Sequence, residues 1–241
     1  MKKIIVHGAS SFIGKNFIKK IISLNIPVII IAREKSQFPF RENNPFVNIY
    51  RYGTNPSEVD LSNDFTCNSV FFEFAWYGVH GSQRNLPKQF SINVPLIISS
   101  VELAHRLKVN HWIGLGSQAE YGNLNKNISE NDVTRPTTIY GKAKLICSEI
   151  SSEMCKTYNI EHTWLRLFSV FGPDDNHEWL IQYLIKKMQN DKEVNVTKGE
   201  QFWDYLYIDD ISNLLMGLSS LYKLKFKKLW KHYVILIDND T

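Results

Sequence analysis

Residues 3–21 read KIIVHGASSFIGKNFIKKI, and this stretch predicts the start of an α/β fold. Residues 3–6 are apolar and rich in β-branched side chains, which is typical of a buried strand. A turn bounded by Gly8 and Gly14 follows, and apolar residues then recur at the spacing of one helix face. A strand, a glycine turn and a helix in this order form the first half of a βαβ unit.

The same alternation continues along the chain. Four further apolar runs suit strands buried on both faces, at 27–32 (PVIIIA), 70–75 (VFFEFA), 111–115 (HWIGL) and 162–167 (HTWLRL). Helical patterns lie between the later runs, at about 92–107 and 142–158. Strands that alternate with helices predict an α/β protein with a Rossmann-like doubly wound parallel sheet and right-handed crossovers.

The composition is that of an ordinary globular protein and argues against a nucleic-acid partner. The chain has 241 residues, of which 44% are hydrophobic and 22% charged, and its formal net charge is +4. Residues 221–241 hold five Lys and two Asp, so the preceding 220 residues are nearly neutral. A nucleic-acid-binding body needs a broad basic face, which such a balance does not provide.

The cysteine and histidine patterns predict neither a disulfide framework nor a metal site. Cys67, Cys147 and Cys155 are too few and too irregularly spaced, and the seven histidines show no ligand spacing. The first apolar run stops at residue 7, short of the roughly 7–15 apolar residues of a signal peptide. No run reaches the ~18 apolar residues of a membrane span. We therefore expect a reduced, cytoplasmic protein without a membrane partner.

The turn after the first strand is the predicted site of a dinucleotide pyrophosphate. Backbone N–H groups at a helix N-terminus favour an anion, Gly8 supplies the tight turn, and Gly14 permits close helix–strand packing. The middle position, commonly glycine, is Ser11, whose Cβ lies where the phosphate approaches. Taken alone, the turn also fits a ligand-free junction. We assign to the cofactor the residues of this turn, namely Gly8, Ser10, Ser11, Phe12, Ile13 and Gly14.

The end of the second strand predicts which dinucleotide binds. An acidic residue there would bind the ribose 2′-OH of NAD, whereas Arg33 offers a fork of donors for the 2′-phosphate of NADP. NADP, as NADPH, is therefore the first expectation. Glu34 is the rival residue, because a strand that ends one position later restores NAD as the alternative cofactor.

A second constellation predicts acid–base chemistry. Tyr140 lies 23 residues after Ser117, and Lys144 follows Tyr140 by four residues, so the two share one helix face. A phenol with a pKa of ~10 is a poor acid at neutral pH, and a cation one turn away would lower that pKa. Ser117 ends a predicted strand, on the ligand edge of the sheet. We assign all three to catalysis; the alternative for the Tyr/Lys pair is an exposed helix face.

The ordered set of glycine turn, Ser117 and the Tyr140/Lys144 pair resembles the extended short-chain dehydrogenase/reductase superfamily. That superfamily contains the NAD(P)-dependent sugar epimerases and dehydratases, and the resemblance runs from residue 2 to about 215. It is carried further by AWYG (75–78), GSQAEYG (116–122), RLFSVFGP (166–173) and WDYLYIDD (203–210). These fragments are most similar to the nucleotide-sugar 4-ketoreductases.

The resemblance implies a role for each matching residue. Ser117 and Tyr140 would contact the oxygen at C4 of the sugar, and Lys144 would bind the nicotinamide ribose. Ala75 would lie beside the cofactor, and Asn93 on the helix that supports the active-site loop. Phe168, Ser169 and Val170 would flank the nicotinamide. We assign to the substrate Trp76, Ser117, Gln118 and Trp203.

The implied reaction is reduction of the C4 ketone of a nucleotide-linked 4-keto-6-deoxy sugar by NADPH, as in surface-polysaccharide sugar biosynthesis, with Tyr140 as proton donor. Two alternatives stay open: an NAD-dependent nucleotide-sugar epimerase or dehydratase, and a cofactor-binding protein without turnover. A homodimer would be usual for the resembled family.

Two departures from the family pattern concern the C-terminal part. Trp203 stands where many members carry an Arg that binds the nucleotide diphosphate. After about residue 220 the chain no longer matches, so we expect a small, incomplete substrate lobe. The expected domains are 1–165, which binds NAD(P) and carries the Ser/Tyr/Lys set, and 166–241, the substrate lobe. Asp209 and Asp210 precede a helical pattern at 211–218, which predicts N-capping.

Overall fold

The computed structural model describes residues 3–40, 43–61, 68–123, 126–199 and 203–219, together with the backbone course of 234–238. Cys67, His232 and the basic part of the tail lie outside these residues. The strands of the main sheet are β1 (Lys3–His7), β2 (Val28–Arg33), β3 (Val47–Tyr52), β4 (Ser69–Glu73), β5 (His111–Ser117), β6 (Glu161–Leu167) and β9 (Val234–Asp238). The helices are α1 (Phe12–Ser23), α2 (Lys88–Arg106), α3 (Ile139–Thr157), α4 (Leu180–Met188) and α5 (Ile208–Leu218).

The main sheet has the order β3-β2-β1-β4-β5-β6-β9. Neighbouring strands from β3 to β6 pair in parallel, and β9 pairs antiparallel with β6. The order reverses direction at β1 and β4, as in doubly wound sheets that bind ligands at this switch point. The predicted Rossmann-like α/β class is confirmed.

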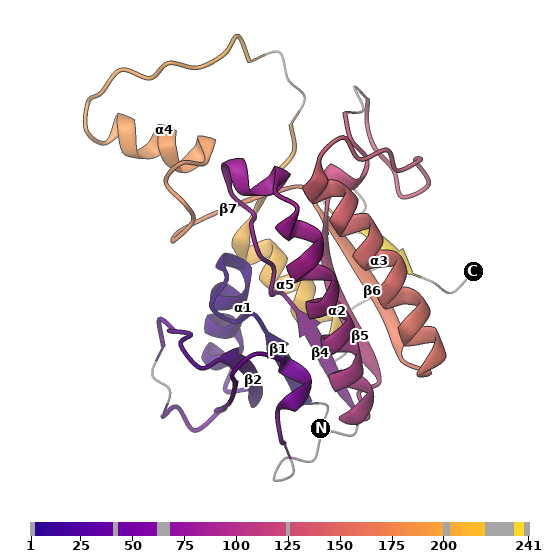
Figure 1. The fold of residues 1–241 in the computed structure, drawn as a ribbon. Coiled ribbons are helices and arrows are strands. Elements are labelled where there is room, and N and C mark those ends of the chain that lie inside the picture. The colour runs from indigo at the N-terminus through magenta and orange to yellow at the C-terminus, as the bar shows by residue number, and fades with distance from the viewer. Residues whose placement is uncertain are drawn as a thin grey trace.

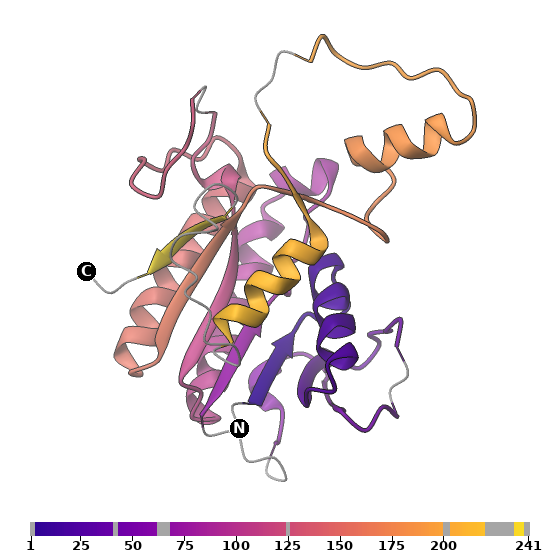
Figure 2. The same cartoon turned by 180° about the vertical axis from the view of Figure 1, so that it is seen from behind.

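Side chains of each central strand alternate between two apolar cores. Ile4 and Val6 face the core that α1 and α5 cover, whereas Ile5 faces the core under α2 and α3. This explains why β1 is apolar at successive positions, because a strand covered by helices on both faces has no solvent side. Figure 1 is seen from the α2 and α3 side, and Figure 2 from the α1 and α5 side.

The structure also corrects the sequence interpretation. Asp209 and Asp210 do not cap α5; Tyr207 is its N-cap, and both carboxylates lie in the first turn. In that position the two negative charges still interact favourably with the positive end of the helix dipole. The strand β3 and the short pair β7 (Ser169–Phe171) and β8 (Tyr205–Tyr207) were not predicted.

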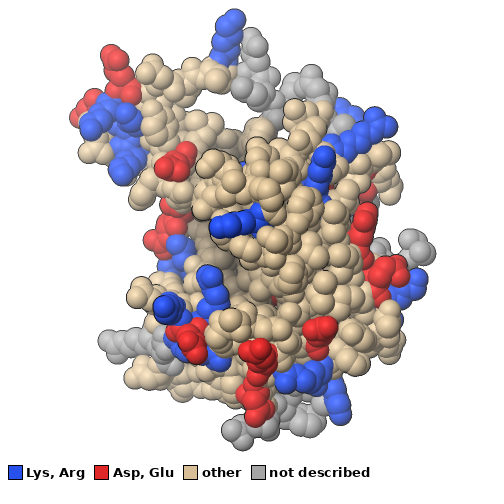
Figure 3. All heavy atoms as spheres, in the orientation of Figure 1, with Lys and Arg blue, Asp and Glu red and all other residues tan. Residues whose placement is uncertain are grey.

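The segment between β7 and β8 leaves the layered body. Both ribbon views show α4 on an arm away from the main sheet (Figures 1 and 2). The arm is anchored near its start, where Lys15 of α1 donates to the backbone oxygen of Asp174 and Lys19 pairs with its carboxylate. The face in Figure 3 carries basic and acidic side chains interspersed.

Candidate active site

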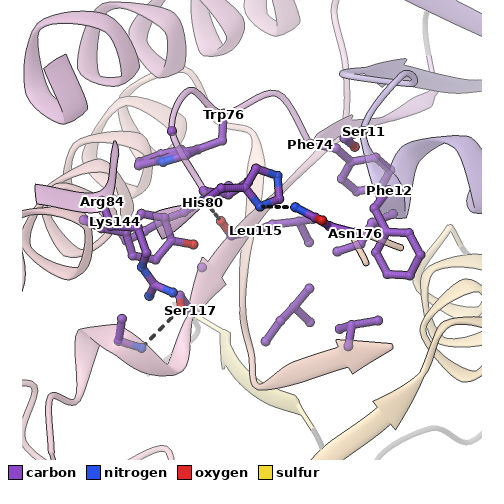
Figure 4. A pocket seen from close by; sticks show the side chains of 18 of the residues that line it. Ser11, Phe12, Phe74, Trp76, His80, Arg84, Leu115, Ser117, Lys144 and Asn176 are labelled. Atoms are coloured by element: carbon purple, nitrogen blue, oxygen red, sulfur yellow. Dashed lines mark hydrogen bonds between the residues drawn. The ribbon is translucent and has the colours of Figure 1, made fainter. Parts of the chain in front are cut away.

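The predicted site residues gather at the carboxyl ends of the parallel strands. All of them except Gly14 line a single cleft, although they come from positions as far apart as Gly8 and Trp203. Figure 4 shows Trp76, Arg84, Lys144 and Ser117 on one side of this cleft, with Ser11 and Phe12 across from them. The cleft therefore joins the glycine turn to the Ser/Tyr/Lys set.

The first turn has the close backbone approach that the sequence predicts. Gly8 adopts φ 83°, and an added Cβ would overlap the backbone of Ala75. Gly14 packs against the turn, because a Cβ there would meet the backbone of Gly8 and Ala9. Ser11 caps α1 by accepting a hydrogen bond from the Gly14 N–H at 3.1 Å. The Ser11 hydroxyl is thus engaged with the helix, and Phe12 and Ile13 of the first turn line the cleft.

Of the two rival residues at the end of β2, Arg33 lies on the cleft and Glu34 does not. Arg33 is the last residue of β2, is exposed and lines the cleft. Glu34 is not among the residues that line it. The backbone oxygen of Glu34 instead accepts a hydrogen bond from Arg51 at 3.0 Å, which fixes the chain just after the strand.

Ser117 ends β5 and is held by a buried charge pair. Its Oγ accepts from the Ala119 N–H at 3.2 Å, and its own N–H donates to the Glu120 carboxylate at 2.8 Å. The other Glu120 oxygen accepts from Arg166 of β6 at 2.6 Å, and both side chains are buried. Glu120 also accepts from the Trp164 indole at 3.1 Å.

Tyr140 lies in the first turn of α3, where Thr138 caps the helix. The phenol is buried, and burial raises its pKa above the usual value. Arg84 and a hydrogen bond with the Ser117 side chain act in the opposite direction. This arrangement corrects the expectation that Lys144 lowers the Tyr140 pKa: the net direction is upward, and Arg84 is the cation that opposes it.

Lys144 is directed at neighbours other than the phenol. Its Nζ donates to the Leu115 backbone oxygen at 2.7 Å and lies 3.5 Å from the Trp76 ring centroid, against 5.9 Å for the Tyr140 ring. Burial lowers the pKa of Lys144 to about 8. The ammonium therefore sits at the sheet edge, between β5 and the loop that carries Trp76.

Two side chains of α2 hold the loop that follows β4 by hydrogen bonds. The Trp76 indole donates to Gln89 at 3.0 Å, and Asn93 bonds both the N–H (2.7 Å) and the C=O (3.1 Å) of Tyr77. Both amide residues are on α2, so Asn93 supports the active-site loop as predicted. At the start of the same loop, the Ala75 N–H donates to buried Glu73 at 2.8 Å.

The other predicted contacts lie around the mouth of the cleft. Phe168 connects β6 to β7, and Gln118 follows Ser117 in a short 3-10 turn. Trp203 is 55% exposed, and its indole donates to the Ser169 hydroxyl. All three line the cleft.

Two groups that sequence reasoning missed belong to this site. Arg84, in the 3-10 turn η2 (Gly81–Asn85), places its guanidinium carbon 4.3 Å from the Tyr140 ring centroid. The Glu120–Arg166 pair lies beneath Ser117. Neither forms a local motif, because each contact joins residues more than 40 positions apart.

The described residues also bear on a metal site and on a membrane-spanning helix. They hold no group of three His, Cys, Asp or Glu side chains arranged for a metal ion. Within the same residues, no helix is both long and apolar enough to span a bilayer.

Comparisons with known proteins find relatives over most of the chain. The chain is 24% identical over 229 residues to protein CapI of Staphylococcus aureus, covering 90% of this chain and 69% of that protein. It is 25% identical over 217 residues to CDP-abequose synthase of Salmonella muenchen, covering 87% and 67%. Among solved structures, the UDP-glucuronic acid 4-epimerase of Bacillus cereus in complex with NAD is similar, with a TM-score of 0.75 and 24% identity over 92% of this chain and 74% of that one.

A family model also matches most of the chain. It covers residues 4–220, which contain the glycine turn, Ser117 and the Tyr140/Lys144 pair. The chain therefore belongs to the NAD dependent epimerase/dehydratase family, a group of NAD(P)-dependent enzymes that modify nucleotide-linked sugars.

Proposed function

We propose that this chain reduces the C4 ketone of a nucleotide-linked 4-keto-6-deoxy sugar, with NADPH as the reductant. The observation that carries the proposal is the buried Tyr140 phenol, which lines the same cleft as Ser117 at the end of β5. Similarity to CDP-abequose synthase over most of the chain supports this substrate class, because the sequence fragments around the site resemble the nucleotide-sugar 4-ketoreductases.

The glycine turn fits a dinucleotide. The close approach at Gly8 leaves no room for a side chain, and the turn leads directly into the N-terminus of α1, where an anion is favoured. Arg33, exposed on the cleft, supports NADPH over NADH because its fork of donors suits a 2′-phosphate. NADPH, when bound, supplies the hydride that C4 receives.

The chain's own residues handle the oxygen. Ser117 holds the carbonyl oxygen, and Tyr140 breaks its O–H bond to give that oxygen a proton while C4 gains the hydride. The products are a C4 alcohol and a phenolate. Lys144, held by its contacts with Leu115 and Trp76, would bind the ribose of the cofactor. Trp76, Gln118 and Trp203 line the part of the cleft left for the sugar nucleotide.

The test is to mix the full chain with NADPH and a panel of 4-keto-6-deoxy nucleotide sugars, following the loss of reduced-nicotinamide absorbance. We expect one panel member to be reduced and Tyr140→Phe to lower kcat by about 100-fold or more, the usual contribution of a general acid. Tyr158→Phe is the matched control: this residue follows α3 and stacks on His105, and it is not among the cleft residues.

The alternatives give different results in the same assay. An epimerase would interconvert nucleotide sugars without net consumption of NADPH. This outcome is measured as well, because the family includes epimerases. If no panel member is reduced, or if Tyr140→Phe works as fast as the parent, the ketoreductase proposal is wrong.

A further inference from the structure

The Tyr140 phenol has a second cationic neighbour besides the predicted Lys144. The Arg84 guanidinium carbon lies 4.3 Å from the Tyr140 ring centroid, whereas the Lys144 ammonium lies 5.9 Å from it. Figure 4 shows both cations on the side of the cleft that holds Ser117. Arg84 is therefore the nearer of the two cations to the Tyr140 ring.

The two cations differ in how firmly they hold their charge. Lys144 is buried, bonded to the Leu115 backbone oxygen and stacked on Trp76, and its lowered pKa of about 8 makes it partly neutral in mildly basic solution. Arg84 also contributes to that lowering, since like charges repel. An arginine cannot be deprotonated in this range, so Arg84 keeps a full positive charge throughout.

Arg84 places its positive charge at the cleft. Arg84 is half-buried in η2 and lines the cleft. Another cation on the substrate side, Lys126, instead forms an ion pair with Asp132. The charges nearest to Tyr140 are then Arg84 and Lys144, with Glu120 as the acidic group that opposes them.

We propose that Arg84 is a positioning residue that stabilises the phenolate form of Tyr140 after the phenol has given up its proton. A guanidinium over the ring face attracts the π-electrons of the neutral phenol. It attracts the phenolate more strongly, because the phenolate carries a full negative charge. The inference rests on the proposed function only for its consequence in turnover, because the effect on Tyr140 exists in the protein without substrate.

The test measures Tyr140 directly. The full chain is prepared with tyrosine labelled with ¹³C at Cζ, and the Tyr140 resonance among the 11 tyrosines is identified by its loss in Tyr140→Phe. Its titration is then followed in the parent, Arg84→Gln, Arg84→Lys and Lys88→Gln. Lys88 begins α2, is exposed and is not among the cleft residues, so its variant removes one positive charge from the neighbouring segment as a matched control.

We expect the Tyr140 titration midpoint to rise in Arg84→Gln, to stay near the parent in Arg84→Lys, and to be unchanged in Lys88→Gln. Equal midpoints in the parent and Arg84→Gln would overturn the proposal. So would a parent resonance that stays protonated up to the pH at which the fold melts. A circular dichroism spectrum equal to that of the parent shows that a variant is folded. If Arg84→Gln does not fold by this criterion, Arg84→Met replaces it.

Turnover separates this inference from the proposed function. If a 4-keto sugar is reduced, Arg84→Gln should lower kcat by about tenfold with little change in KM, and should shift the pH profile of kcat in the same direction as the NMR midpoint. If no sugar is reduced but the midpoint moves, the ketoreductase proposal fails and the role of Arg84 stands. A pH profile that does not move in Arg84→Gln contradicts the role even where kcat falls.

Discussion

Single residues in this site depend on partners that are distant in sequence. Ser117 presents its hydroxyl to the cleft because Glu120 holds its backbone N–H, and Glu120 in turn is held by Arg166 on the adjacent strand. Removing one member of a buried ion pair leaves the other charge without compensation, which costs more than the pair contributes when intact.

We therefore predict that Arg166→Met lowers the free energy of unfolding by about 3 kcal/mol, as expected when a buried carboxylate loses its cation. Urea denaturation measures the effect. The double variant Glu120→Gln/Arg166→Met should recover part of the loss, because no unpaired charge remains.

Lys19→Met provides the comparison, because its partner Asp174 is also an ion-pair carboxylate but both side chains are about half exposed (44% and 53%). Such a pair contributes less than about 1 kcal/mol. A loss for Arg166→Met no larger than that for Lys19→Met would show that the Glu120–Arg166 pair does not hold this part of the site.

At the scale of an element, the turn between β1 and α1 is the most constrained segment of the cleft. Gly8 combines a positive φ with the contact to Ala75, so both its conformation and its missing side chain are needed. The turn between β1 and α1 and the loop after β4 therefore pack so closely that no side chain fits at Gly8.

We predict that Gly8→Ala destabilises the fold by at least about 1 kcal/mol, the cost of left-handed backbone for an L-residue, and weakens NADPH binding. Thermal unfolding and fluorescence titration with NADPH measure the two effects. Gly53→Ala is the control, since an added Cβ there comes no closer than 3.9 Å to its nearest neighbour. Equal behaviour of the two variants would contradict the tight fit.

Elements with an unmistakable local pattern were predictable, and those defined by their neighbours were not. The central strands are apolar on both faces, so β1, β2, β4, β5 and β6 could be found from sequence. The strand β3 lies at the edge of the sheet and mixes exposed with buried positions, which removes the apolar run. The boundary at residue 165 stays a prediction; α5, which follows it, packs against α1.

The same distinction holds for the site. Ser117, Tyr140 and Lys144 could be proposed because the last two are one helical turn apart and the first ends an apolar run. Arg84 could not, because η2 has no pattern that aims a side chain at α3. The upward pKa of Tyr140 could not be predicted either, since it follows from burial, which only the packed structure shows.

At the scale of the whole molecule, the cleft exists because distant segments end at one edge of the sheet. A cofactor that spans this edge binds the folded chain and not the unfolded one, so binding adds to stability by mass action. If Arg33 or Glu34 at the end of β2 contacts the dinucleotide, the stabilisation should differ between NADPH and NADH.

We predict that NADPH at about 100 times its Kd stabilises the fold by about 2.7 kcal/mol, and that NADH at the same concentration stabilises it less. Arg33→Ser should bring the effect of NADPH down to that of NADH. Thermal shift measurements with both dinucleotides test this. If Glu34→Gln instead removes the effect of NADH and Arg33→Ser changes nothing, the carboxylate is the ribose ligand and NAD the preferred cofactor.

The antiparallel strand β9 forms the outer edge of the main sheet beside β6. It pairs with β6 from Thr163 to Leu167, so the backbone N–H and C=O groups on that margin of the sheet are already occupied. An open margin beside a strand as apolar as β6 would be a template for intermolecular sheet growth. Residues 234–238 therefore replace an exposed edge of seven residues by one of five, and a shorter edge offers fewer unpaired backbone groups to another copy of the chain.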